Sequence, residues 1–302
     1  MTQTLVPARP AWLDPALYPF SPRRFATPEG EMSYLDEGTG PVVLLVHGTP
    51  SWSFEFRDVV RALASNHRVI APDHLGFGLS DKPLTALRPE DHARRLRALV
   101  EALDLRGITL VAHDFGGPIA LPLALDTPGR VRRVTVINSW MWASEGDPEI
   151  ARIDRLVRSP LGRFLYRWLG FSARVILPHA FGDRRRLTRA LHQHYLQPLS
   201  SRQAREGTYA LACGLRGSDA HYDGLWQRRD VLASLPLTLI WGERDPVLTR
   251  VHRDRWLQAF PTARLISVAD AGHFVAEERP DVIIAALRDF AGNRPQETAM
   301  RL

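Results

Sequence analysis

The residues best suited to chemistry in this chain are two carboxylates and one histidine, and each follows an apolar stretch. Asp114, Asp245 and His273 stand in that order along the sequence. In an open parallel sheet the carboxyl ends of the strands share one edge, so we expect these three side chains to lie together. Such a set can supply a nucleophile, an acid that orients a base, and the base itself. The pattern predicts a hydrolytic site centred on Asp114.

Asp114 stands at a sharp turn between a predicted strand and a predicted helix. The run 108–112 is apolar, which indicates a buried strand, and the segment 118–125 has helical composition. A turn of the form G-x-S-x-G lifts one side chain above the end of a strand. Here His113 takes the place of the first glycine and Asp114 the place of the serine. The chemistry must therefore begin from a carboxylate.

The elements that would position these residues alternate along the chain. A hairpin is predicted from 24–27 and 31–36. The apolar segments that predict further strands are 41–46, 67–72, 108–112, 131–138, 235–242 and 264–268, and the intervening helices are 57–65, 89–103, 118–125, 250–259 and 280–290. This order predicts an α/β fold with a mostly parallel sheet covered by helices on both faces.

The segment 139–229 interrupts this alternation with arginine- and leucine-rich helical sequence. Because strands resume after it, we predict a core domain formed by 1–138 and 230–302, with 139–229 as a helical cap. The stretch 151–190 holds ten arginines against two aspartates. That excess indicates either a solvated basic helix face or a cap that attracts anions.

Composition excludes several classes of protein. Cys213 is the only cysteine, so an internal disulfide or a cysteine metal cluster cannot form, and no zinc motif is present. No apolar run approaches the roughly 18 residues of a membrane span, and residues 1–20 lack a signal-like apolar segment. The net charge of +6 comes from the cap alone, which argues against a nucleic-acid surface. We expect a cytoplasmic protein with no nucleic-acid or membrane partner.

These motifs resemble the α/β-hydrolase superfamily, within it the haloalkane dehalogenase and epoxide hydrolase branch, and most of all the haloalkane dehalogenases. The resemblance spans about 25–290. It rests on the loop 47–53, the loop 72–80, the turn 113–117 and the segment 272–274, which resemble the oxyanion-hole loop, the loop after the next strand, the nucleophile turn and the histidine loop. The implied fold is the α/β-hydrolase fold.

The resemblance also implies the site residues. Asp114 would be the nucleophile, His273 the base and Asp245 the acid, with Glu243 as the competing acid two residues earlier. Asn138 resembles the asparagine that follows this strand in dehalogenases whose acid comes after the later strand. The predicted oxyanion hole consists of the backbone N–H groups of Thr49 and Phe115.

The implied reaction is cleavage of a carbon–halogen bond in a small halogenated substrate, with neither metal nor cofactor. Asp114 would displace the halide and form an alkyl ester, which His273-activated water would hydrolyse to the alcohol. Haloalkane dehalogenases usually place a tryptophan after the nucleophile, but Phe115 has no N–H to hold the halide. Candidate replacements for halide and substrate binding are Trp168, Trp140 and Asn138, with Trp142 as a further indole.

Two alternatives remain at this point. An epoxide hydrolase with the same triad would need an acid for the ring oxygen, usually two cap tyrosines. The cap tyrosines are Tyr166, Tyr195, Tyr209 and Tyr222, of which Tyr195 and Tyr222 are the stronger candidates. From a different class, the chain could be a catalytically idle hydrolase fold that binds a ligand.

Overall fold

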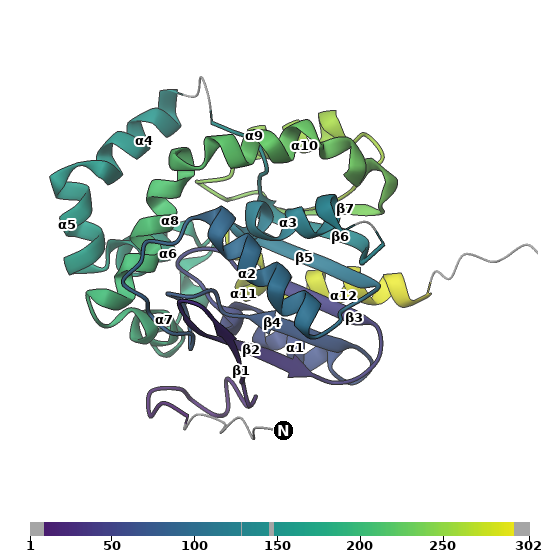
Figure 1. Cartoon of the computed structure of the whole chain (residues 1–302), viewed down its shortest axis with the longest axis horizontal. Helices are drawn as coiled ribbons and strands as arrows, with labels where there is room; N and C mark the ends of the chain where they lie inside the picture. Colours follow the sequence, from purple (N-terminus) through teal and green to yellow (C-terminus); the bar gives the residue numbers. More distant parts are fainter. Residues whose placement is uncertain (1–8, 128, 145–147, 293–302) are drawn as a thin grey trace, which may run out of the picture.

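An eight-stranded sheet forms the centre of the computed structural model, which describes residues 9–127, 129–144 and 148–292 (Figure 1). The strands are β1 (Arg23–Thr27), β2 (Gly30–Glu37), β3 (Val42–Val46), β4 (Arg68–Pro72), β5 (Ile108–Asp114), β6 (Val131–Ser139), β7 (Leu237–Gly242) and β8 (Arg264–Val268). Their spatial order is β1-β2-β4-β3-β5-β6-β7-β8. Pairing is antiparallel from β1 to β4 and parallel from β4 to β8. The predicted α/β class is confirmed.

Apolar side chains project from both faces of this sheet, because successive residues of a strand point to opposite sides. In β3, Leu44 and Val46 join one buried cluster, and Val43 and Leu45 join the other. The first cluster is covered by α2 (Pro89–Ala102), α3 (Gly116–Asp126) and α10 (Arg250–Ala259), and the second by α1 (Arg57–Leu63) and α12 (Pro280–Gly292). Two helical layers therefore hold the strand ends rigidly in place.

Only helices and turns occur between β6 and β7 in the described residues. The α-helices there are α4 (Pro148–Arg158), α5 (Pro160–Leu169), α6 (Leu177–Ala180), α7 (Arg189–Leu196), α8 (Glu206–Gly217) and α9 (Asp219–Gln227). Figure 1 shows α4, α5 and α8 gathered at one side of the molecule, beyond the sheet. The helical character matches the sequence prediction. The division into a 1–138 and 230–302 core and a 139–229 cap stays a prediction, and it includes residues outside the described ranges.

The strand boundaries differ from the sequence prediction by a few residues. The expected strand from residue 235 begins at Leu237, because Pro236 has no N–H and contributes only its carbonyl, which accepts a hydrogen bond from Val134 N at 3.0 Å. Among the described helices, none has the length and apolar character needed to cross a bilayer.

Candidate active site

Asp114 occupies the tip of a tight turn between β5 and α3. Its φ of 52° lies in the left-handed region, which is rare for a residue with a side chain and marks a constrained position. A Cβ atom on Gly48 would lie 2.3 Å from Asp114 Oδ2, and one on Gly116 would lie 2.2 Å from the carbonyl oxygen of Val46. Glycine is therefore required at position 116 of the turn and at position 48 of the facing loop after β3 for the carboxylate to take this position.

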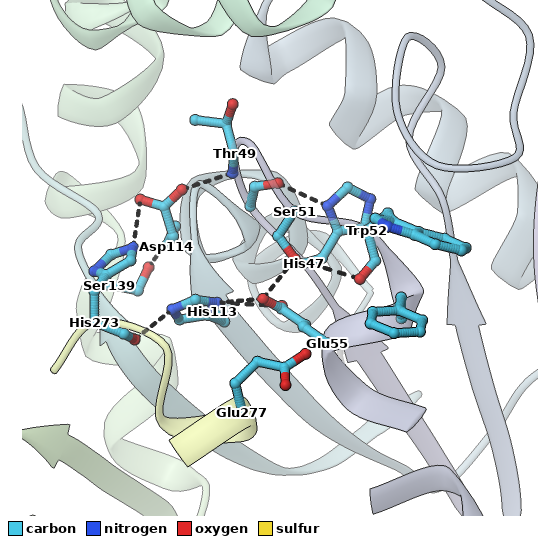
Figure 2. Close-up of polar contacts among 12 residues, drawn as sticks. His47, Thr49, Ser51, Trp52, Glu55, His113, Asp114, Ser139, His273 and Glu277 are labelled. Atoms are coloured by element: carbon cyan, nitrogen blue, oxygen red, sulfur yellow. Dashed lines mark hydrogen bonds and ion pairs between the residues drawn. The ribbon is translucent and has the colours of Figure 1, made fainter. Parts of the chain in front are cut away.

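Backbone N–H groups surround the Asp114 carboxylate. The N–H of Thr49 donates a hydrogen bond to Oδ2 at 2.8 Å (Figure 2). Burial raises the pKa of Asp114, and the rise is opposed by the nearby His273 and His113 and by the backbone N–H groups of Thr49 and Phe115. The two N–H groups predicted as an oxyanion hole thus both lie at this carboxylate.

His273 lies between the two carboxylates. Its Nδ1 donates to Asp245 Oδ2 at 2.7 Å, and its Nε2 is 3.6 Å from Asp114 Oδ1. Burial lowers the pKa of His273, but the charges of Asp245 and Asp114 outweigh it and raise the pKa to about 9. The Nε2 atom is the one directed at the predicted nucleophile.

Hydrogen bonds fix both oxygens of the Asp245 carboxylate. Its Oδ1 accepts the backbone N–H groups of Val247 and Leu248 at 2.7 and 3.0 Å, and Asn138 Nδ2 donates to its Oδ2 at 2.7 Å. Burial opposes ionisation, yet His273 and these N–H donors hold the pKa of Asp245 below its ordinary value. The carboxylate is fixed and charged beside the imidazole.

Asn138 was expected near the halide, and the structure corrects that expectation. Its Oδ1 accepts the N–H of Gly242 at 2.8 Å while its Nδ2 donates to Asp245, so both ends of the amide are used. The side chain ties β6 to the end of β7 and is absent from the described cavity wall.

Glu243, the competing acid, instead pairs with Arg253 and accepts from Ser267 Oγ at 2.7 Å.

A buried chain of hydrogen bonds lies behind His273 and was not predicted from the sequence (Figure 2). We call this chain the relay. His113 Nε2 donates to the backbone carbonyl of His273 at 2.9 Å, and Glu55 Oε2 lies 3.1 Å from His113 Nδ1. Ser51 Oγ donates to the same carboxylate oxygen at 2.6 Å. Since a carbonyl only accepts, the hydrogen bond to His273 is donated by His113 Nε2. The relay fixes the backbone that presents the imidazole.

A cavity of about 460 Å³ opens above Asp114 and His273. Its wall is mainly apolar and includes Phe115, Trp140 and Trp142. Within the described ranges, no group of histidine, cysteine or acidic residues is arranged to hold a metal ion. The cavity suits a small apolar molecule whose reacting atom meets the carboxylate.

The tryptophans divide into two sets. The indole N–H groups of Trp52, Trp241 and Trp256 donate to carbonyl oxygens at 2.8–3.0 Å, whereas those of Trp140 and Trp142 have no acceptor among the described residues. Trp140 packs edge-on against Phe115, with ring centroids 4.8 Å apart. Two indoles with free donors therefore line the cavity, and Trp140 is the one in contact with the residue after the predicted nucleophile.

Trp168 was also expected near the halide, and the structure places it elsewhere. Its side chain is 55% exposed, and the guanidinium of Arg202 lies 4.8 Å from its ring centroid. Trp168 is not among the residues of the cavity wall. Spacing along the cap sequence was the only signal for it, and α5 turns this position to the outside.

The tyrosines proposed as epoxide acids also point away from the cavity. Tyr195 donates its hydroxyl to Glu277, and Tyr222 donates to the carbonyl of Gly214 at 2.9 Å. Tyr166 is the tyrosine found on the described cavity wall. The pair of acids that an epoxide ring would need is not presented to Asp114.

Comparisons with known proteins identify the family of this chain. The family model of the alpha/beta hydrolase fold matches residues 41–280. The chain is 34% identical to haloalkane dehalogenase 2 of Mycobacterium tuberculosis over 92% of this chain and 98% of that protein. It is 32% identical to the cis-3-alkyl-4-alkyloxetan-2-one decarboxylase of Shewanella oneidensis, over 91% and 89%.

A solved structure shows the same fold. Haloalkane dehalogenase DbeA of Bradyrhizobium elkani has a TM-score of 0.81 and 24% identity, covering 90% of this chain and 98% of the other. At that identity the likeness concerns the fold alone, and the membership rests on the family match and the relatives above. The chain belongs to the α/β-hydrolase-fold family, in the branch that contains the haloalkane dehalogenases, and is an enzyme of the hydrolase type.

Proposed function

We propose that this enzyme cleaves the carbon–halogen bond of small apolar haloalkanes, with Asp114 as the nucleophile. The observation that carries the proposal is the placement of the Asp114 carboxylate at the floor of an apolar cavity, held by the Thr49 N–H and 3.6 Å from His273 Nε2. Attack by a carboxylate oxygen on the carbon forms the C–O bond of an alkyl ester while the C–halogen bond breaks. No metal or cofactor takes part in this step. A cytoplasmic setting belongs to the same proposal.

In the second step, water attacks the ester carbonyl with His273 as the base. Esterification removes the Asp114 charge, which is one of the causes that raise the pKa of His273 to about 9. We therefore expect that pKa to fall in the ester, leaving Nε2 free to accept the proton of water. The N–H groups of Thr49 and Phe115 would stabilise the tetrahedral oxyanion, with each donor contributing about 3 kcal/mol.

Trp140 and Trp142 are the proposed donors to the departing halide. Replacing Trp140 with phenylalanine keeps most of its packing against Phe115 and removes the N–H. We expect kcat/KM for a bromoalkane to fall about tenfold to a hundredfold, because a hydrogen bond to a charged group contributes about 1.5–3 kcal/mol. Trp168→Phe is the matched control on the outer surface, and its kcat/KM should stay within about twofold of the wild type. Equal effects of the two substitutions would contradict the assignment.

Asp245 is the proposed partner of His273 in the hydrolytic step. In Asp245→Asn the pKa of His273 should fall from about 9 toward the ordinary 6.5, because the charge that stabilises the imidazolium is gone. Hydrolysis of the ester should slow by about 10²–10⁴-fold, since the imidazole loses its orienting acceptor. NMR titration of the His273 ring and single-turnover kinetics measure the two effects. If the Glu243→Gln variant shows these losses and Asp245→Asn does not, the acid has been misassigned.

A second candidate reaction is the opening and decarboxylation of a β-lactone, the four-membered ring named in the decarboxylase relative. Asp114 would attack the saturated ring carbon that is bonded to the ring oxygen, and cleavage of that C–O bond would leave a carboxylate on the neighbouring carbon. Loss of that carboxylate as CO₂ would form the C=C bond and expel Asp114. The observation in favour is Phe115: the leaving carboxylate stays in the molecule, so no halide donor is needed next to the nucleophile. The buried hydroxyls of Thr49 and Ser172, which lack partners among the described residues, also line this cavity.

One panel of substrates separates these reactions. Dehalogenation predicts halide release from chloro-, bromo- and iodoalkanes, together with the matching alcohol. Release of CO₂ and an alkene from a cis-dialkyl oxetan-2-one, without halide from any haloalkane, would replace the first proposal with the second. Diol formation from styrene oxide alone would restore the epoxide alternative.

A further inference from the structure

The outer side of the cap carries an exposed apolar face on α4 and α5. We define this cap apolar face as Leu156, Leu161, Phe164, Trp168 and Leu169, which are 48–59% exposed. Leu161, Phe164 and Trp168 follow helical spacing and therefore share one side of α5, while Gly162 and Tyr166 on the other side are buried. Clustered large apolar side chains are uncommon on the free surface of a monomer and mark an interaction site.

Arginines surround this face. Arg152 and Arg155 are exposed and have no acidic partner among the described side chains, and Arg202 stacks over Trp168. Two acids close by, among the described side chains, are already neutralised: Asp154 pairs with Arg158 at 2.7 Å, and Glu206 pairs with Arg167 at 2.8 Å. Among the described side chains, the apolar face is thus framed by arginines that lack an acidic partner.

We propose that the cap apolar face docks on an anionic lipid surface. Leucine, phenylalanine and tryptophan side chains enter the interface of a bilayer, and the flanking arginines contact its phosphate groups. A second copy of the chain fits less well, because a two-fold contact through this face would set the same arginines against one another. Peripheral docking needs no membrane-spanning helix, so it is compatible with the absence of a span from the described helices, but it departs from the sequence expectation of no membrane partner.

The docking face is continuous with the cavity wall. Ile153, on α4, is 38% exposed and also lines the cavity together with Ile150 and Val157 of the same helix. In Figure 1, α4 and α5 form one edge of the molecule. A docked enzyme would hold this edge of the cavity against the lipid, where apolar molecules accumulate. The docking itself does not depend on which reaction Asp114 performs.

Co-sedimentation of the full chain with vesicles tests the proposal. We expect binding to phosphatidylcholine vesicles that contain about one-third phosphatidylglycerol, and weak binding to pure phosphatidylcholine. The double variants Leu161→Ser/Phe164→Ser and Arg152→Gln/Arg155→Gln should each weaken binding about tenfold. The matched control is Val251→Ser/Arg250→Gln, which removes an exposed valine and an exposed arginine at the start of α10, and it should bind as the wild type does.

Thermal unfolding of each variant confirms that only the surface has changed. Absence of binding to the anionic vesicles overturns the proposal, and so does binding that the Leu161/Phe164 variant retains in full. Sedimentation equilibrium adds a third readout. A dimer that the same substitutions abolish, without vesicle binding, would identify a second copy as the occupant and overturn the lipid assignment.

Discussion

Asp114→Asn is expected to lower kcat for any haloalkane by at least about 10⁴-fold, because an amide oxygen is a poor nucleophile toward saturated carbon. The fold should survive the change, since an amide has the size of a carboxyl group and its oxygen can still accept the Thr49 N–H. Halide release in single-turnover conditions measures the first step directly. No burst should appear.

The control for this variant must distinguish loss of the nucleophile from loss of the folded structure. Asn at position 114 retains one acceptor and the turn at φ 52°, so the melting temperature should stay near that of the wild type. Residual turnover must also be checked for deamidation back to aspartate by mass spectrometry of the peptide. A variant that is folded, free of aspartate and still active at more than a few per cent would exclude Asp114 as the nucleophile.

His273→Phe is expected to stop the reaction after the first step. Phenylalanine fills much of the volume of the imidazole but cannot take a proton from water, so hydrolysis of the ester should slow by about 10²–10⁴-fold. Alkylation of Asp114 does not need that base. The enzyme should release one equivalent of halide and then stall, with its mass increased by the alkyl group.

The same variant distinguishes the two candidate reactions. Decarboxylation of a β-lactone consumes no water, so loss of the water-activating base should leave it largely intact. A His273→Phe enzyme that fails to release any halide would contradict the two-step scheme, because His273 would then be needed for the displacement. Trapped ester mapped to a residue other than Asp114 would contradict it as well.

That the three predicted site residues lie together could be predicted from the sequence, because each follows a strand of a parallel sheet. Asp114, Asp245 and His273 each follow an apolar run that becomes a strand of a parallel sheet. Parallel strands end on one edge, so residues far apart in the chain had to converge there. The glycines beside Asp114 also indicated a tight turn, and the structure shows the close contacts that require them.

The cap was less predictable, because helical periodicity does not reveal which side of a helix meets the cavity. Trp168 and Trp140 are both indoles after β6, yet packing places one on the surface and the other beside Phe115. Tyr195 likewise turns to Glu277 and not to the nucleophile. These outcomes depend on how α5 and α7 pack in space, which no local pattern encodes.

The relay through Glu55 and His113 shows a second limit of sequence reasoning. Glu55 lies 58 positions before His113, in a short helical turn after the Thr49 loop, and no motif connects the two. Their contact exists only because β3 and β5 are neighbours in the sheet. His113 itself was visible beside Asp114, but its role in holding the His273 backbone required the folded arrangement.

The proposed reaction requires that Asp114 form a covalent ester that water hydrolyses at the carboxyl carbon. Its most direct test is a single turnover of a bromoalkane in ¹⁸O-labelled water with the enzyme in excess. We expect ¹⁸O to enter the carboxylate of Asp114 and the alcohol to carry the unlabelled oxygen of the enzyme. An ¹⁸O-labelled alcohol with an unlabelled Asp114 would show that water attacks the substrate directly and would exclude Asp114 as the nucleophile.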